Sequence, residues 1–279
     1  IGQAFSIFAS ERPRPVHISI PIDVLSEHVV DDWQAVALPT KAQPLKSAIE
    51  DAAKLLKTAE RPVILLGGGA TDCADSMTQL AERLGAIVVT SCSGKGIVPD
   101  RHPLSLSATT VRPEVQELLG TADVTLAIGT EISETDSFVE RLDLGGKLIR
   151  IDLDPRKMND FYPADIPIVG DAKTATDLLL TALREGQGTS GAEAIVAGIK
   201  TAISNNLSLS EQQHVKLLNG LREALPDNAI MMGDACQVAY TGAFAMPVSH
   251  PRLWHYAAGY CTLGPALPDA IGAKIAQPD

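Results

Sequence analysis

Short, mainly apolar runs alternate with longer amphipathic segments through residues 45–183. The runs have the length of buried strands, and they lie at 63–66, 86–90, 124–128, 147–152 and 166–169. Between them, apolar residues return every three or four positions, which predicts helices over 45–56 and 77–84. Because strands and helices alternate, the pattern predicts an α/β fold built on a doubly wound parallel sheet.

Three residues mark the ends of predicted helices. Pro44 precedes the first helix, where the missing proline N–H is of no consequence. Gly85 follows the second helix and can adopt the left-handed conformation that often ends a helix. Asp171 precedes a third helix, running through Leu183, and its side chain can accept hydrogen bonds from the free N–H groups of the first turn.

The segments on either side of this sheet have other patterns. Toward the N-terminus we expect a helix that ends within 1–9, a strand over 16–21 between prolines, and a linker over 27–43. A second linker is predicted at 186–192, which is rich in glycine and small polar residues. The elements expected beyond it are helices near 193–204 and 215–225, a strand at 229–233, an aromatic strand-like piece from Trp254, and a small-residue helix opened by Pro268. The predicted domains are 1–36, 37–185 and 186–279.

Composition and charge exclude several functions. The chain has 279 residues, of which 45% are hydrophobic and 20% charged, as in globular proteins. Its net charge of −11, without a long basic run, argues against binding to nucleic acid or anionic membranes. No apolar run reaches the roughly 18 residues that a bilayer-spanning helix needs. The four cysteines form neither a zinc pattern nor a disulfide framework, which favours a reducing cytoplasm.

The order of residues near the end of the chain carries a resemblance. Gly-Tyr-Cys-Thr-Leu-Gly at 259–264 precedes Leu-Pro-Asp-Ala-Ile-Gly-Ala-Lys at 267–274. This order resembles the signature of thiamine-diphosphate-dependent enzymes of the acetolactate synthase and 2-oxo-acid decarboxylase type. Further collinear matches lie at 15–24, 93–103 and 151–155. The resemblance implies the tail of an N-terminal pyrimidine-binding domain, a complete Rossmann-like middle domain, and the first part of a C-terminal diphosphate-binding domain. The chain would then be a fragment.

The resemblance also implies which residues bind the cofactor. In the turn after the strand at 229–233, Ala235, Cys236 and Gln237 would lie beside the diphosphate. In the signature, the Cys261 carbonyl would accept a hydrogen bond from the cofactor's amino group, and Thr262 would lie beside it. Leu263 would be the apolar wedge that holds thiamine diphosphate bent. The residues so implied are Ala235, Cys236, Gln237, Cys261, Thr262 and Leu263.

This sequence departs from the family at two of these positions and at the neighbouring position 238. Cysteine stands at 236 and 261 where glycine is usual, and Val238 stands where acetolactate synthases often have histidine. Because no histidine and acid accompany Cys236, we expect a small buried thiol there and no nucleophile. The resemblance places the catalytic glutamate and the Mg²⁺ ligands outside these residues. We therefore assign no catalytic or metal-binding side chain within the chain, and we expect the chain alone to be inactive.

The predicted middle domain has its own candidate ligand site. Gly67-Gly68-Gly69 follows a strand and precedes a helix, where an open α/β sheet can hold a diphosphate, although the pattern is not GxGxxG. Family members carry FAD, ADP or CoA there, and many carry nothing. We expect Glu131, Glu134 and Asp136 to repel a diphosphate, which disfavours FAD. We expect Lys95, between two glycines, to belong to a structural loop.

The resemblance implies decarboxylation or carboligation of a 2-oxo acid. The segment 129–136 is more similar to decarboxylase-type relatives, including guanidino-oxo-acid decarboxylases, than to acetolactate synthases. Three alternatives stay open: an acetolactate synthase large subunit, a non-catalytic binding or assembly homologue, and a stand-alone nucleotide-binding domain. Because family active sites form between two subunits, the resemblance also implies a homodimer or homotetramer.

Overall fold

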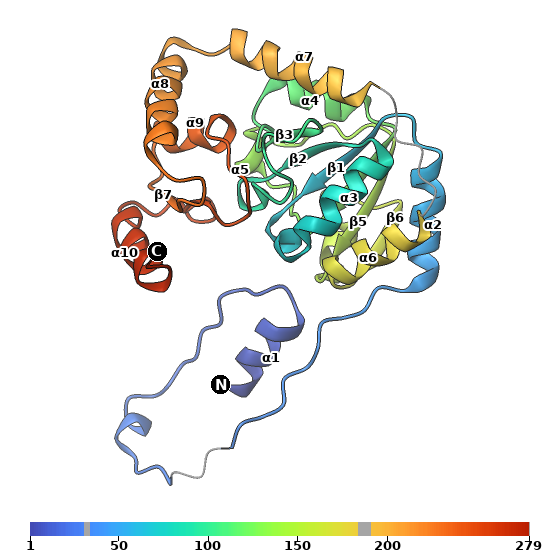
Figure 1. Ribbon diagram of the computed structural model, residues 1–279. Coiled ribbons are helices and arrows are strands. Elements are labelled where there is room, and N and C mark those ends of the chain that lie inside the picture. The colour runs from blue at the N-terminus through green and yellow to red at the C-terminus, as the bar shows by residue number, and fades with distance from the viewer. Residues whose placement is uncertain (31–33, 184–190, 279) are drawn as a thin grey trace.

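A six-stranded parallel sheet forms the centre of the computed structural model, which describes residues 1–30, 34–183 and 191–278 (Figure 1). The strand order is β3-β2-β1-β4-β5-β6, so the chain moves outward from β1 to one edge and then from β4 to the other. The strands are β1 (Pro62–Leu66), β2 (Ile87–Thr90), β3 (Ser105–Ser107), β4 (Val124–Ile128), β5 (Lys147–Asp152) and β6 (Ile166–Val169). The predicted doubly wound α/β fold is confirmed.

Helices cover both faces of this sheet. On one side α6 (Ala172–Ala182) packs against α2 (Lys46–Lys57) and α3 (Ala74–Leu84), whereas α4 (Pro113–Thr121) packs against α7 (Ala192–Asn205) on the other (Figure 1). The predicted helix ends at Gly85 and Asp171 are confirmed. Gly85 is left-handed with φ 57°, and Asp171 Oδ2 accepts a hydrogen bond from Thr174 N at 3.0 Å.

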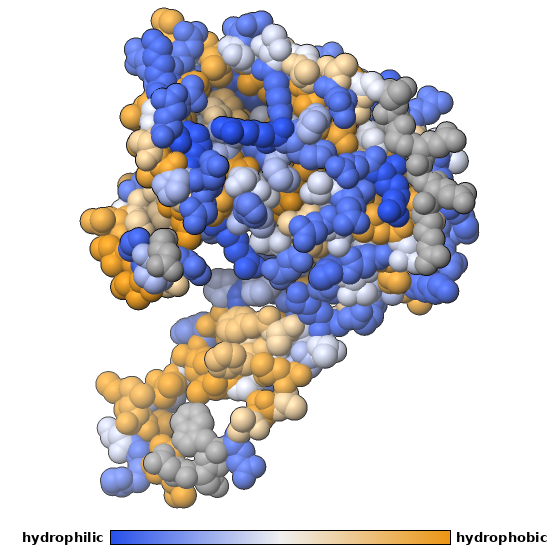
Figure 2. All heavy atoms as spheres, viewed as in Figure 1, coloured by the Kyte–Doolittle hydropathy of each residue, from blue (hydrophilic) through white to orange (hydrophobic). Residues whose placement is uncertain are grey.

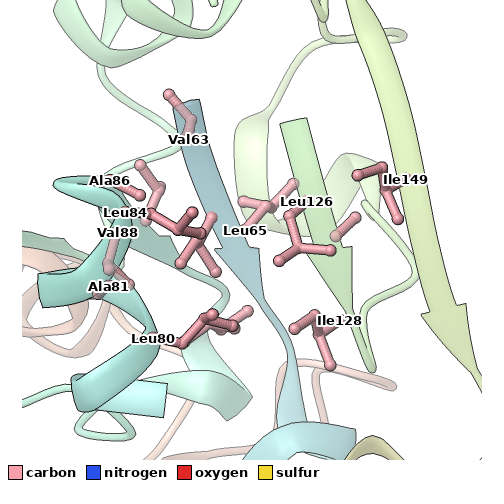
Figure 3. Packing of buried hydrophobic residues seen from close by; sticks show 14 of the residues in the cluster. Val63, Leu65, Leu80, Ala81, Leu84, Ala86, Val88, Leu126, Ile128 and Ile149 are labelled. Atoms are coloured by element: carbon pink, nitrogen blue, oxygen red, sulfur yellow. The ribbon is translucent and has the colours of Figure 1, made fainter. Parts of the chain in front are cut away.

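The apolar runs form the core. Val63 and Leu65 of β1 lie among Leu80 and Leu84 of α3 and Leu126 of β4 (Figure 3). Every residue of β1, β2 and β4 is buried, as a strand covered on both faces requires. Each fully buried Leu, Val or Ile contributes about 1.5–3 kcal/mol through removal of apolar surface from water.

A second, smaller group of elements follows the sheet. It comprises α8 (Leu209–Ala224), β7 (Met231–Gly233), α9 (Gln237–Ala245), β8 (Trp254–Tyr256) and α10 (Ala266–Ala276). Strands β7 and β8 pair in parallel, and α8 packs on α9 around a small core that includes Leu218 and Trp254. Helix α10 begins at Ala266, so the prediction that Pro268 opens it is wrong.

The N-terminal segment extends away from the sheet (Figure 1). It contains α1 (Gly2–Ser10), and residues 11–30 form no strand, so the strand predicted for 16–21 is wrong. A strand needs a partner for its N–H and C=O groups, and no described strand pairs with these residues. Figure 2 shows hydrophobic residues gathered on this segment, among them Phe5, Ile20 and Ile22, which are exposed. Most of the linker predicted at 186–192 lies outside the described residues.

Candidate functional site

The resemblance implies two segments that bind the cofactor, and in the structure they follow neighbouring strands. Residues 235–237 come just after β7, and residues 261–263 come in the turn after β8. Because Gly233 at the end of β7 pairs in register with Tyr256 at the end of β8, both turns leave the same edge of the small sheet. In open parallel sheets this carboxyl edge is where ligands bind. The structure therefore brings together two segments that lie far apart in the sequence.

One carboxylate joins the two turns. Asp234 Oδ1 accepts hydrogen bonds from Gly264 N at 2.8 Å and from Ala266 N at 3.3 Å. The backbone of the same residue holds its own turn, because Asp234 O accepts from Cys236 N at 2.8 Å. Charge-assisted hydrogen bonds of this kind are about twice as strong as neutral ones. The sequence reading missed this role, although an aspartate directly after a strand was the available signal.

The residues of the second turn are open to a ligand. Leu263 is 79% exposed although it is a large apolar residue, and Thr262 is also exposed. Cys261 has φ 54°, a left-handed conformation in which glycine is favoured, and its N–H donates to Ala257 O at 2.7 Å. This conformation is consistent with the glycine that the resemblance leads us to expect at this position. An exposed leucine on a turn fits the wedge role that the resemblance implies.

The first turn differs from the expectation at one residue. Cys236 is exposed, so the prediction of a buried thiol is wrong. Cys236 stands at the N-cap of α9 with an extended backbone, and a residue in that position projects outside the helix, where little covers it. Gln237 is exposed beside it, and Ala235 is half-buried. The turn therefore presents the N-terminal end of α9, whose free N–H groups favour an anion.

Aromatic side chains connect both turns to the six-stranded sheet. Tyr256, the last residue of β8, places its Oη 3.3 Å from Cys92 Sγ in the loop after β2. Its ring meets Tyr240 of α9 edge-to-face at 5.8 Å between centroids, and Tyr240 meets Phe138 in the same way at 6.4 Å. On the other side, Cys92 N donates to Asp136 Oδ1 at 3.0 Å. These contacts fix the start of the second turn relative to the loops of the larger sheet.

The thiol in this group is not a nucleophile. Burial raises the pKa of Cys92 to about 12, and the nearby Asp136 carboxylate adds to that rise. Burial likewise raises the pKa of Tyr256 and of Asp136. A thiol that keeps its proton at neutral pH serves as a hydrogen-bonding group, because reactivity requires the thiolate.

A separate crevice lies at the carboxyl edge of the six-stranded sheet. It has a volume of about 300 Å³ and is lined by residues that include Gly68, Gly69, Gly129, Asp152 and Arg12. It lies where the strand order reverses between β1 and β4, the usual ligand position in such sheets. The glycines allow a close backbone approach, since a Cβ built on Gly67 would meet Gly129 O at 2.1 Å.

Two of the three carboxylates expected to repel a diphosphate at this crevice, Glu131 and Asp136, have other partners. Glu131 Oε1 lies 3.1 Å from Arg12 Nη1, 3.4 Å from Arg14 Nη2 and 3.5 Å from Lys157 Nζ, so its charge is compensated. Asp136 turns to the Cys92 backbone instead of the crevice. The N-terminal segment supplied these arginines, which the sequence pattern could not place. The expectation that this crevice disfavours FAD stays a prediction.

Lys95 is confirmed as part of a structural loop. Its side chain is buried, pairs with Asp100, and donates to Ser107 Oγ at 2.8 Å. Burial lowers the pKa of this ammonium group, and the Asp100 carboxylate opposes that effect. A phosphate could not reach Lys95 without disrupting this pair.

Two kinds of feature are absent from residues 1–30, 34–183 and 191–278. Within these ranges, no three His, Cys, Asp or Glu side chains come together as a metal site. The same ranges contain no helix with the length and apolar character needed to cross a membrane.

Comparison with known proteins decides the family. Residues 49–181 match the family model described as the central domain of thiamine pyrophosphate enzymes. Residues 49–181 therefore form a central domain of the thiamine pyrophosphate enzyme family. It is 42% identical over 281 residues to a probable 2-ketoarginine decarboxylase of Pseudomonas aeruginosa, covering all of this chain and 50% of the relative.

Acetolactate synthases are also similar. A probable acetolactate synthase large subunit of Methanocaldococcus jannaschii is 33% identical over 302 residues, with 99% of this chain and 50% of the relative covered. The acetolactate synthase isozyme 1 large subunit of Escherichia coli is 29% identical over 290 residues, with 100% and 51% covered. The chain spans about half the length of the curated relatives it matches.

Proposed function

We propose that this chain belongs to a thiamine-diphosphate-dependent enzyme that decarboxylates a 2-oxo acid, with a guanidino-oxo acid as the favoured substrate. The observation that carries the proposal is the meeting of the 235–237 and 261–263 turns at one sheet edge, joined by Asp234. The choice of substrate is supported by the 42% identity to a probable 2-ketoarginine decarboxylase.

The two turns would bind different parts of the cofactor. The start of α9, with Ala235, Cys236 and Gln237, would hold the diphosphate, because helix N-termini attract anions. Leu263 and the Cys261 carbonyl would orient the aminopyrimidine and thiazolium rings, with Thr262 between them. Bound thiamine diphosphate supplies an electron sink for the bond that breaks when carbon dioxide leaves. Mg²⁺ on the diphosphate is part of the proposal, with ligands outside these residues.

The proposal extends to the assembly and the domain borders. We place the middle domain at 37–185, the tail of a pyrimidine-binding domain at 1–36, and the first part of the diphosphate-binding domain at 186–279. A homodimer or homotetramer in the cytoplasm fits this arrangement. The exposed apolar residues of the N-terminal segment and of α10 support further contacts in the assembled protein.

Acetolactate synthase is the second candidate. It is favoured by the identity of 33% to the Methanocaldococcus jannaschii relative. Against it stands Val238, since the resemblance leads us to expect histidine there in acetolactate synthases. Carboligation and decarboxylation share the step in which carbon dioxide leaves, so the products decide between them.

The test uses the full-length protein with Mg²⁺ and thiamine diphosphate. A panel of 2-oxo acids, including pyruvate and 5-guanidino-2-oxopentanoate, is assayed for carbon dioxide and for the organic product. We expect the guanidino acid to give the aldehyde. Acetolactate from pyruvate would favour the second candidate. No turnover of any acid, together with no calorimetric binding of thiamine diphosphate, would leave a binding or assembly protein.

A further inference from the structure

A second cavity lies apart from the candidate cofactor turns. It has a volume of about 460 Å³ and lies between the loop that leads into β3 and the helices α7, α8 and α9. None of the residues 235–237 or 261–263 lines it. Its size falls within the range typical of small-molecule pockets, about 300–1,000 Å³.

One side of the cavity carries positive charge. Lys200 of α7 and Arg101 line it, and neither has a carboxylate partner among the described residues. The Lys200 ammonium donates one hydrogen bond, to the Asp100 carbonyl at 3.1 Å, which leaves further donor capacity. Partial burial lowers the pKa of Lys200, and an anion beside the ammonium group would offset that effect.

The negative charge of the Asp100 carboxylate, which lies beside these cations, is already compensated. The Asp100 carboxylate pairs with the buried ammonium of Lys95, and its Oδ2 also accepts from Val248 N at 2.9 Å. Asp100 is itself among the lining residues, but its remaining Oδ1 is buried without a hydrogen-bond partner in the described part of the chain, so this oxygen is not exposed to the cavity. The charge that the cavity offers a ligand is therefore that of Lys200 and Arg101.

The rest of the lining is mainly apolar. Leu106 and Ile203 are buried residues of the lining, and Val215 of α8 and Phe244 of α9 also line the cavity. The Phe244 ring is held by the guanidinium of Arg112, which lies 5.3 Å from the ring centroid. A ligand complementary to this cavity has an anionic end and a hydrocarbon body.

We propose that this cavity binds a small carboxylic acid with an apolar body, whose carboxylate contacts Lys200 and Arg101 and whose body contacts Leu106, Ile203 and Phe244. Such a ligand touches α7, which packs on the six-stranded sheet, and also α8 and α9, which pack on each other beside the cofactor turns. It would therefore stabilise one arrangement of the two groups of elements. The site does not depend on the proposed activity.

The test is calorimetric titration of the full-length protein with 4-phenylbutanoate, and with 4-phenylbutan-1-ol as the uncharged counterpart. We expect the acid to bind and the alcohol to bind at least about tenfold more weakly, because a charge-assisted contact is lost. Saturating thiamine diphosphate is present throughout, so that the acid cannot compete at the cofactor turns.

Three variants locate the site. Lys200→Met should weaken the binding of 4-phenylbutanoate by about tenfold. The control Lys216→Met removes an exposed lysine of α8 outside the cavity and should leave that binding unchanged. Ser204→Trp places a large ring among the lining residues and should also abolish binding. Thermal unfolding of each variant shows that it is folded. Equal binding of acid and alcohol, wild-type affinity in Lys200→Met or Ser204→Trp, or no binding of the acid to wild type would overturn the proposal.

Discussion

The six-stranded sheet and the β7–β8 pair follow the same parallel plan but differ in how far their residues bury one another. Every residue of β1, β2 and β4 is buried, whereas the residues of β7 are only half-buried. Helix α10 has no buried residue, and Leu267, Ile271 and Ile275 line up at four-residue spacing on one exposed face. An apolar pattern thus predicts a core in the first region, while in the second it marks a surface.

The largest effect is expected in the core of the six-stranded sheet. Leu126 in β4 is fully buried, so Leu126→Ala should lower the free energy of unfolding by about 2–5 kcal/mol through a lost side chain and a cavity. Leu209→Ala at the exposed start of α8 is the matched control and should change it by less than about 0.5 kcal/mol. Urea unfolding measures both, and equal losses would contradict the contrast between buried and exposed apolar positions.

The next effect concerns the contact that joins the two cofactor turns. Asp234→Ala removes the acceptor for Gly264 N and Ala266 N, and hydrogen bonds to a charged group contribute about 1.5–3 kcal/mol. Thiamine diphosphate should therefore bind about tenfold or more weakly by calorimetry. Asp227→Ala, on an exposed turn before β7, should leave that affinity unchanged. Unaltered affinity in Asp234→Ala would mean that the two turns do not act as one site.

A smaller effect is expected where the N-terminal segment meets the six-stranded sheet. Hydrogen bonds from Arg156 and Arg14 hold the pKa of the Asp154 carboxyl well below its usual range. A depressed folded-state pKa adds stability above the unfolded-state pKa of about 3.9, and this stability is lost as the pH falls through the folded-state pKa. Asp154→Asn should cost about 1 kcal/mol at pH 7. The difference from wild type in urea unfolding should shrink below pH 4, and a constant difference would contradict this.

The smallest effect concerns the tyrosine that connects the two regions. Tyr256→Phe keeps the ring but removes the hydroxyl beside Cys92 Sγ, a weak hydrogen bond worth less than about 1 kcal/mol. We expect a several-fold rise in the KM for thiamine diphosphate, because the start of the second turn loses one contact. The control is Tyr260→Phe, whose hydroxyl belongs to a residue that is 91% exposed. A greater effect at Tyr260 than at Tyr256 would place the connection elsewhere.

The region that the sequence predicted best is the six-stranded sheet with its covering helices, where the apolar residues are buried against one another. The runs at 63–66 and 124–128 and the cap residues Gly85 and Asp171 needed only local patterns, and they are confirmed. Strand β3 was missed because Ser105 and Ser107 are polar, although both are buried. Helix α9 was missed because it is apolar on several sides and contains Gly242, which leaves room for the Trp254 ring.

The site was predicted by residue order and not by burial. The two turns were found through their resemblance to a family, whereas the hydrogen bonds of Asp234 depend on a strand pairing that no local pattern contains. The expectations for Cys236 and Glu131 also missed features that appear only in the folded chain. The exposure of the first follows from the helix cap, and the charge of the second is compensated by arginines more than a hundred residues away in the sequence.

The most direct test of the account is a crystal structure of the full-length protein with thiamine diphosphate and Mg²⁺. The account predicts the diphosphate at the start of α9, beside residues 235–237, with Leu263 against the rings of the cofactor. It also predicts that the Asp234 contacts to Gly264 and Ala266 persist. Thiamine diphosphate bound away from both turns, or in contact with only one of them, would contradict the central claim that the two turns form a single cofactor site.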